Sequence, residues 1–267
     1  MLWEIFLIDS ILGGIGLPLL LGWWCGWQDS WQFLVTGLAC FAVQLLLFLL
    51  FLGVYVLVAA KRPVALGRTP IYNAALQVVR IVNRICRVHF TVTGEELPRV
   101  PFLLIANHRS GFDPLVLLEA FSSKTITYIS KPENFRIPLI GAVIHRCGFL
   151  RIDRENPRKA MATINSAAEQ ITQHGVSVGV FPEGTRSKDN SLLPFHNGVL
   201  KIAQKAHAPL VVVTLQGTEL VKSRAPFRRT DVTVQIEEVI LPEEFEGQKT
   251  AALAERARAA MLKTLEQ

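Results

Sequence analysis

Hydrophobic and polar residues follow two different patterns along this chain, and the change occurs near residue 60. Residues 31–60 carry no charged side chain and are apolar almost throughout. A helix of about 20 such residues crosses the hydrocarbon core of a bilayer, so this segment predicts a membrane span. The apolar stretch at 11–27 is shorter, rich in glycine and contains Pro18, which fits a second span, a re-entrant segment or an interfacial helix. We therefore expect residues 1–60 to form a membrane anchor with one or two hydrophobic segments.

Beyond residue 60 the pattern alternates between strands and helices. Residues 102–106 and 176–181 are short apolar runs of the kind that form buried strands. Residues 70–88 and 158–174 place apolar side chains at helical spacing. Strands that alternate with helices predict an α/β fold, here a mixed sheet flanked by helices. Because no long linker divides this part, we expect residues 61–267 to form a single domain.

Charge is distributed as unevenly as hydrophobicity. All 28 Lys and Arg residues follow residue 60, together with 19 of the 22 Asp and Glu residues. Lys61, Arg62 and Arg68 come directly after the predicted span, so the positive-inside rule places residues 61–267 on the cytoplasmic side. The basic excess suits an anionic partner: phospholipid headgroups, a phosphorylated substrate or an acidic carrier protein. We do not expect a nucleic-acid partner, because such a partner fits poorly with a membrane anchor and the sequence contains no recognisable nucleic-acid-binding motif.

Several common kinds of site are not expected. The four cysteines form no CxxC pair and no Cys/His ligand spacing, which predicts free thiols in a reducing compartment and no metal site. The chain has no GxSxG nucleophile motif, no GxGxxG loop and no phosphate-binding P-loop.

Three polar clusters are candidates for chemistry. The first, NHRSGFD at 107–113, follows the predicted buried strand 102–106 and contains His108 and Asp113. Asp113 fits an ordinary helix N-cap before Pro114, but it also fits a carboxylate that holds a histidine base. The other two clusters are GFLRIDR at 148–154 and FPEGTRS at 181–187, each of which taken alone fits a surface turn.

In combination and in this order, the three clusters resemble the motif blocks of the glycerolipid acyltransferases, and most of all the 1-acylglycerol-3-phosphate (lysophosphatidate) acyltransferases. The resemblance extends from about His89 to about Leu241. It implies an acyltransferase domain in which His108 is the general base and Asp113 orients it. The resemblance also implies residues that bind the acceptor's glycerol phosphate: Arg154, Glu183, Gly184, Thr185 and Arg186, with Lys131 as a further phosphate contact.

The same resemblance implies a reaction. An acyl group from acyl-CoA or acyl carrier protein (ACP) would pass to the sn-2 hydroxyl of 1-acylglycerol 3-phosphate, a membrane lipid, without a cofactor. The family usually has a second proline in the strand that corresponds to APLVVV at 208–213, where this chain has Val212, so the acyl chain and the donor stay open. The expected location is an integral membrane protein, in a bacterial inner membrane, with its active domain in the cytoplasm.

Two other interpretations remain. The first is an acyltransferase for another acceptor, such as glycerol 3-phosphate, a lysophospholipid or a lyso-aminolipid. The second is a non-catalytic membrane lipid-binding protein, in which the pairing of His108 with Asp113 would have no chemical role.

Overall fold

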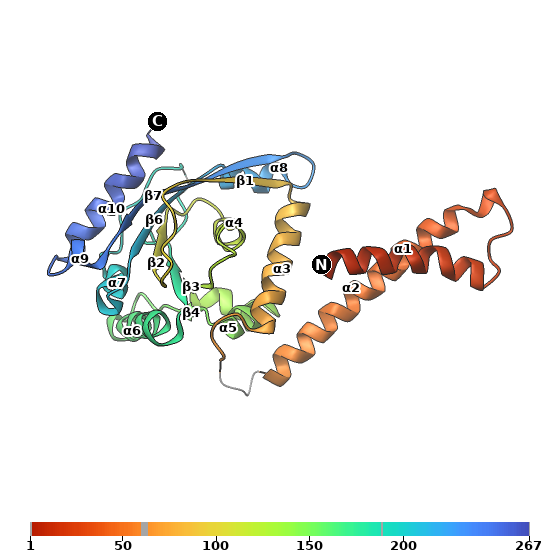
Figure 1. Cartoon of the computed structure of the whole chain (residues 1–267), viewed down its shortest axis with the longest axis horizontal. Coiled ribbons are helices and arrows are strands. Elements are labelled where there is room, and N and C mark those ends of the chain that lie inside the picture. The colour runs from red at the N-terminus through yellow and green to blue at the C-terminus, as the bar shows by residue number, and fades with distance from the viewer. Residues whose placement is uncertain (1, 60–63, 188, 267) are drawn as a thin grey trace. The chain divides into compact units, whose positions relative to one another are not determined.

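The computed structural model describes residues 2–59, 64–187 and 189–266, and it divides into two units between residues 63 and 64 (Figure 1). The N-terminal unit contains two helices joined by a short connection. Its elements are α1 (Leu2–Leu20), the 3₁₀ helix η1 (Trp27–Asp29) and α2 (Trp31–Ala59). The helix predicted within 11–27 therefore begins earlier and ends at Leu20. Beyond that residue the backbone turns, with Trp23 N–H donating to the carbonyl of Pro18.

α1 and α2 pack against each other as a helical hairpin, and small residues lie where they meet. A Cβ atom on Gly14 would come within 2.8 Å of the Cα of Gly37, so the two backbones approach too closely for a side chain. Thr36 Oγ1 donates to the carbonyl of Gly14 at 2.8 Å across the same contact. Close approach at small residues, with hydroxyl bonds between helices, is typical of membrane helix pairs.

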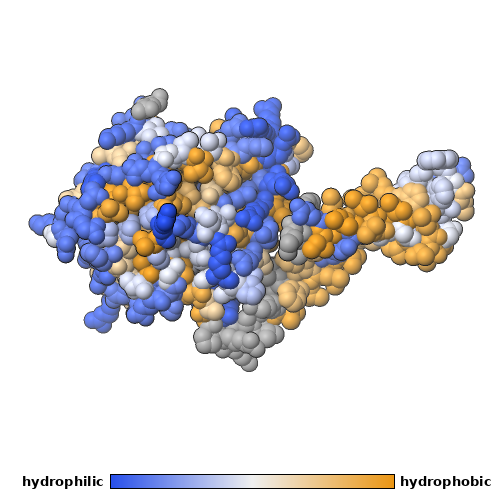
Figure 2. All heavy atoms as spheres, in the orientation of Figure 1, coloured by the Kyte–Doolittle hydropathy of each residue, from blue (hydrophilic) through white to orange (hydrophobic). Residues whose placement is uncertain are grey.

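One described segment, Trp27–Phe51, is long and apolar enough to cross a membrane. Large apolar side chains are exposed along both helices of the hairpin, and Figure 2 shows its visible face as mostly hydrophobic. These observations make the hairpin a candidate membrane segment.

The C-terminal unit, Val64–Gln267, contains one sheet and the helices that cover it. Its strands are β1 (Val88–Gly94), β2 (Leu103–Ala106), β3 (Ile126–Ser130), β4 (Leu150–Arg151), β5 (Ser177–Val180), β6 (Leu210–Gln216) and β7 (Thr230–Ile240). Its α-helices are α3 (Pro70–Ile85), α4 (Asp113–Ala120), α5 (Ile140–Arg146), α6 (Pro157–His174), α7 (Lys201–Ala206), α8 (Val221–Arg224), α9 (Pro242–Phe245) and α10 (Thr250–Leu265). Three 3₁₀ helices complete it: η2 (Pro132–Arg136), η3 (Asn197–Leu200) and η4 (Thr218–Leu220).

The strand order is β1-β7-β6-β2-β5-β3-β4, and every neighbouring pair is parallel except β6 and β7. The expected α/β fold with a mixed sheet and flanking helices is thus confirmed. β2, β5 and β6 lie side by side in the centre, where every described side chain of β2 and β5 is buried. Parallel strands covered on both faces read as continuous apolar runs, which explains why these segments lack alternation.

Two apolar clusters cover the two faces of the sheet. One cluster includes Leu103, Val178 and Val212 and is closed by residues of α6, α7 and α10. The other includes Leu104, Tyr128 and Val213 and is closed by residues of α4 and α8. Alternate residues of each central strand therefore enter opposite cores, as the two-residue period of a strand requires.

The start of α5 depends on a close backbone contact. Ile140 is the first residue of this helix. Leu139 precedes it with a φ of 62°, and a Cβ on Gly141 would come within 2.1 Å of the carbonyl oxygen of Phe135. The missing side chain at Gly141 lets the helix start directly against η2.

Candidate active site

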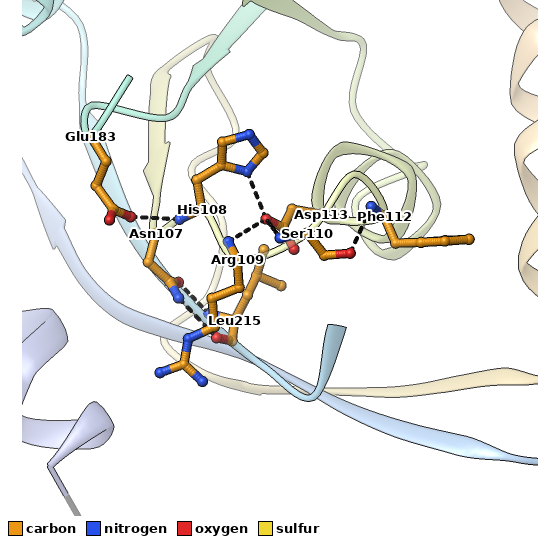
Figure 3. Close-up of polar contacts among 8 residues, drawn as sticks. All are labelled: Asn107, His108, Arg109, Ser110, Phe112, Asp113, Glu183 and Leu215. Carbon is orange, nitrogen blue, oxygen red and sulfur yellow. Dashed lines mark hydrogen bonds and ion pairs between the residues drawn. The ribbon is translucent and has the colours of Figure 1, made fainter. Parts of the chain in front are cut away.

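The loop that carries His108 begins with a side chain that is bonded across the sheet. Asn107, at the end of β2, is buried, and its Nδ2 donates to the carbonyl of Leu215 on β6 at 2.9 Å. The amide N–H of Leu215 returns a bond to Asn107 Oδ1 at 2.7 Å (Figure 3). One amide side chain thus satisfies both backbone groups of a residue on the neighbouring strand, which fixes where the loop leaves the sheet.

His108 and Asp113 form the central pair of the site. Nδ1 of His108 lies 2.7 Å from Oδ2 of Asp113, whose side chain is fully buried (Figure 3). The backbone N–H groups of Arg109 and Ser110 donate to the same oxygen at 2.7 and 2.8 Å. The contacts with His108, Arg109 and Ser110 around one oxygen hold the carboxylate in place.

The interpretation of Asp113 as a helix N-cap was wrong. Asp113 is the first residue of α4, Phe112 occupies the N-cap position, and no side chain caps this helix. Its carboxylate instead accepts from the residues that precede the helix, Arg109 and Ser110. The carboxylate closes the loop onto itself, and this closure brings the histidine within reach.

An aromatic stack supports the imidazole from its face. The rings of His108 and Phe181 are 4.3 Å apart and nearly parallel at 22°. Phe181 lies in turn at 5.9 Å and 11° against Tyr128, which is buried on β3. The side chain of His108 keeps 19% exposure, and its second nitrogen points away from Asp113 (Figure 3). One ring nitrogen is therefore held by Asp113, and the other lies on the opposite side of the ring.

Glu183 acts as a clamp between two loops. Its Oε1 accepts the backbone N–H of His108 at 2.6 Å and its Oε2 accepts that of Leu193 at 2.9 Å. Burial raises the pKa of this carboxyl, while the two backbone bonds and the nearby His108 lower it. Because its two oxygens accept backbone N–H groups from two different loops, Glu183 fixes the positions of these loops relative to each other.

Arg154 and Gly184 meet beside a pocket of about 280 Å³. Nη1 of Arg154 donates to the carbonyl of Gly184, which has a φ of 73°. A Cβ on Gly184 would come within 2.8 Å of Arg154 Nη1 and 2.9 Å of His196 Cδ2. The pocket wall is apolar at Ile152 and Ile164 and basic at Arg154 and His196. Burial lowers the pKa of Arg154. Arginine side chains nevertheless stay cationic at neutral pH.

The other predicted site residues occupy different places. Thr185 and Arg186 are exposed on the loop after Gly184, and Nη1 of Arg186 would lie 3.8 Å from a Cβ on Gly111, at the rim of the histidine loop. Lys131 is exposed after β3, and its side chain forms no hydrogen bond or ion pair within the described residues. The structure thus gathers His108, Asp113 and Glu183 and sets Arg154 beside Gly184.

Three contributors were missed by the sequence reasoning. Asn107 and Phe181 lie inside the quoted motifs, but the cross-strand bond of one and the ring stack of the other depend on distant partners. His196 lies in the segment that follows the third motif and joins Arg154 at the pocket. The signal available for His196 was its position shortly after that motif. Within the described part of the chain, no group of three or more His, Cys, Asp and Glu side chains could hold a metal ion.

Comparison with known proteins identifies the class. Residues 89–216 match the family model named Acyltransferase, and this range contains all three motifs. This match of residues 89–216 to the Acyltransferase model confirms the resemblance drawn from the motifs.

Named relatives narrow the comparison further. The chain is 33% identical over 145 residues to a 1-acyl-sn-glycerol-3-phosphate acyltransferase of Limnanthes douglasii, a match that covers 54% of this chain and 51% of the relative. The protein of that name from Saccharomyces cerevisiae is 32% identical over 181 residues, covering 66% of this chain and 59% of the relative. The chain thus spans about half the length of the curated relatives it matches.

A solved structure has a similar fold. The crystal structure of the 1-acyl-sn-glycerophosphate (LPA) acyltransferase from Thermotoga maritima matches with a TM-score of 0.56 at 23% identity. The match covers 82% of this chain and 95% of that one, and it supports the fold.

Proposed function

We propose that this protein is an O-acyltransferase that transfers a fatty acyl group from acyl-CoA or acyl-ACP to the sn-2 hydroxyl of 1-acylglycerol 3-phosphate, which yields phosphatidic acid. The observation that carries the proposal is the 2.7 Å contact between His108 and the buried Asp113. The names of the relatives in Limnanthes douglasii and Saccharomyces cerevisiae support the choice of acceptor.

The mechanism follows from the two nitrogens of His108. Nδ1 is held by Asp113, so Nε2 is the nitrogen that accepts the proton of the acceptor hydroxyl. Imidazoles in general ionise near neutral pH, which suits a general base, and a paired carboxylate stabilises the imidazolium that forms. The hydroxyl oxygen attacks the thioester carbonyl, the C–S bond breaks, and the departing thiolate takes the proton from Nε2. No covalent acyl-enzyme and no cofactor take part.

The phosphate of the acceptor binds at the cationic side chains beside this pair. Arg154 lies against Gly184 at the pocket, and Arg186 projects from the same loop near Gly111. Guanidinium groups match phosphate oxygens in geometry and charge. Gly184 lines the same pocket, Thr185 follows it on the loop, Glu183 holds the start of this loop against the backbone of His108, and Lys131 supplies a further cation. Binding the phosphate there fixes the distance from the hydroxyl to His108.

The N-terminal unit holds the protein in the bilayer in which acceptor and product reside. Residues 61–267 face the cytoplasm, where the donor thioester is available, and a bacterial inner membrane is the proposed location. Labelling of Glu246→Cys by a membrane-impermeant reagent, before and after the cells are opened and in a background in which the four native cysteines are replaced by serine or alanine, tests this orientation. Labelling of intact cells would contradict it.

The reaction is tested with membranes that contain the protein, labelled acyl-CoA or acyl-ACP, and 1-acylglycerol 3-phosphate. The unsubstituted chain is expected to form phosphatidic acid, and His108→Ala to reduce the rate by roughly 10²- to 10⁴-fold. His89→Ala is the matched control, because His89 is exposed on β1 and outside the site. Equal product from His108→Ala and the unsubstituted chain would remove His108 from the mechanism.

Reversing the charge of Arg186 distinguishes a phosphate-bearing acceptor from a neutral one. Arg186→Glu is expected to raise the KM for a phosphate-bearing acceptor while it leaves turnover of a neutral lyso-lipid unchanged. If the protein acylates the neutral lyso-lipid and Arg186→Glu does not change the rate, the acceptor is a lipid other than 1-acylglycerol 3-phosphate. If no acceptor is acylated and lipid binding is indifferent to His108→Ala, the protein is a lipid-binding protein.

A further inference from the structure

A basic surface outside the pocket surrounds the end of α3 and the loop after α8. We call it the basic rim, and its cationic residues are Arg84, Arg87, Lys222, Arg224, Arg228 and Arg229. Three apolar side chains are exposed among them: Phe227 at 84%, Ile85 at 56% and Leu220 at 38%. Figure 2 shows strongly hydrophilic residues gathered over this region, beside a small hydrophobic patch.

Specific contacts build the basic rim. Arg87 has a φ of 53°, in the left-handed region that few non-glycine residues adopt. Its carbonyl accepts from the amide of Thr230 at 3.0 Å, and its Nη1 donates to the carbonyl of Phe227 at 3.1 Å. The amide of Arg228 donates to the carbonyl of Arg224, which closes the loop on itself. The exposed Phe227 is therefore held on an ordered loop that is joined to α3.

Strand direction places the basic rim at the same end of the sheet as His108, the end at which β2 terminates. β6 is parallel to β2, and β7 is antiparallel to β6, so Thr230 at the start of β7 lies at the edge where β2 ends. β1 is parallel to β7, with Val88 opposite Thr230, which brings the end of α3 to this edge as well. Glu219, beside Leu220, forms an ion pair at 3.7 Å with Arg109, the residue after His108.

Little negative charge offsets the basic rim. Asp231 pairs with Arg229 at 2.6 Å. Across the described residues, the side chains of Arg84, Lys222, Arg224 and Arg228 have no carboxylate within ion-pair distance. Unpaired cations around an exposed aromatic ring form a surface that attracts anions and presents an apolar tip.

We propose that the basic rim docks the C-terminal unit onto an anionic bilayer surface, with Phe227 and Ile85 entering the headgroup region. A bilayer fits this surface because the exposed apolar side chains of Phe227 and Ile85 protrude among cations of which several have no carboxylate partner within the described residues. Interfacial segments combine aromatic tips with Lys and Arg in this way, and anionic headgroups attract each cation separately. Docking through the basic rim turns this end of the sheet, with the loop of His108, toward the lipid surface. The proposal concerns binding alone and does not depend on the reaction proposed above.

The test uses the full-length chain in nanodiscs, either of phosphatidylcholine alone or with phosphatidylglycerol added. Phe227→Cys carries an environment-sensitive fluorophore, in a background in which the four native cysteines are replaced by serine or alanine. Glu246→Cys is the control position, because Glu246 is exposed beyond the opposite end of β7. With phosphatidylglycerol present, the label at 227 is expected to shift to the blue and to be quenched by lipid-attached quenchers, while the label at 246 is not.

Two further arms make the result decisive. Lys222→Glu with Arg228→Glu is expected to bring the signal at 227 down to that at 246, whereas Arg158→Glu with Lys205→Glu, an equal charge change outside the basic rim, is not. Hydrogen exchange of the unsubstituted chain checks the labelled protein, with slowing expected at residues 222–229 in anionic nanodiscs. Equal signals at 227 and 246 with unchanged exchange would overturn the proposal. A response that requires an added acidic carrier protein would overturn it in favour of a protein partner.

Discussion

Nδ1 of His108 lies 2.7 Å from Oδ2 of Asp113, although Asp113 begins a helix and His108 stands in the loop before it. The backbone N–H groups of Arg109 and Ser110 hold the same oxygen, so the loop supplies the geometry of the pair. The pair is therefore formed locally, within seven residues, and is then fastened to the sheet through Asn107 and Glu183.

Asp113→Asn keeps the size of the side chain but removes its charge. An amide cannot stabilise the imidazolium as a carboxylate does, so we expect acyl transfer to fall by roughly 10²- to 10⁴-fold. Initial rates of the single variant, of His108→Ala and of the double variant measure the effect. The double variant is expected to be little slower than His108→Ala, because the two residues act as a unit. Multiplicative losses would contradict joint action.

Asn107→Ala tests the bond between the histidine loop and β6. The change leaves the buried N–H and carbonyl of Leu215 without their partner, so we expect a loss of about 2–4 kcal/mol in the free energy of unfolding. Asn156→Ala is the matched control, because Asn156 caps α6 near the surface with one bond to the amide of Lys159. That change is expected to cost about 1 kcal/mol. Denaturant unfolding in detergent measures both, and equal losses would contradict the prediction.

Glu183→Gln is expected to change how stability depends on pH. Burial raises the pKa of Glu183 above its unfolded value, so its contribution is present at low pH and is lost as pH rises through the folded pKa. Relative to the unsubstituted chain, the glutamine variant should therefore gain stability as pH rises from acidic to neutral. Unfolding midpoints measured across that range test the sign.

Glu244→Gln is the control, because the pKa of Glu244 is shifted in the opposite direction to that of Glu183. A hydrogen bond from Arg256 lowers the pKa of Glu244, so its contribution is present above the unfolded pKa and is lost as pH falls through the folded pKa. Glu244→Gln should lose stability relative to the unsubstituted chain as pH rises over the same range. Two variants with the same trend would show that the assigned causes are incorrect.

Gly184→Ala and Gly175→Ala separate backbone strain from crowding. Both glycines have positive φ, 73° and 65°, so both changes are expected to cost about 1 kcal/mol of stability. A Cβ on Gly184 would in addition press on Arg154 and His196, whereas nothing lies within 4 Å of one on Gly175. We expect only Gly184→Ala to raise the KM for the acceptor. An equal change in KM for both would place Arg154 outside the acceptor site.

Local patterns predicted the elements that depend on local burial. The apolar runs at 102–106 and 176–181 became β2 and β5, and the periodic segment 158–174 became α6. Gly175 ends α6 in the left-handed conformation that glycine allows at little cost. Each of these features depends on neighbours a few residues away, so the sequence alone contains the information.

Glu183 shows where sequence reasoning stops. Its motif pointed to substrate binding, yet its carboxylate bonds to the backbone of His108, 75 residues earlier in the chain. Phe181 is similar, because its ring stacks on His108 only after β2 and β5 pair. A motif gives residue types and order, while the partners of a buried side chain depend on which strands lie together.

By itself, the sequence determined the long apolar segment before residue 60 and the alternating strands and helices after it, and its motifs implied the pairing of His108 with Asp113 through their resemblance to the acyltransferases. The first two follow from hydrophobic periodicity. Only the tertiary structure decided that β7 runs against β6, which brings Arg87, Phe227 and the basic rim to the edge that carries His108. Strand order and direction arise from backbone bonds between distant segments, and the burial pattern of a single strand is the same in either direction.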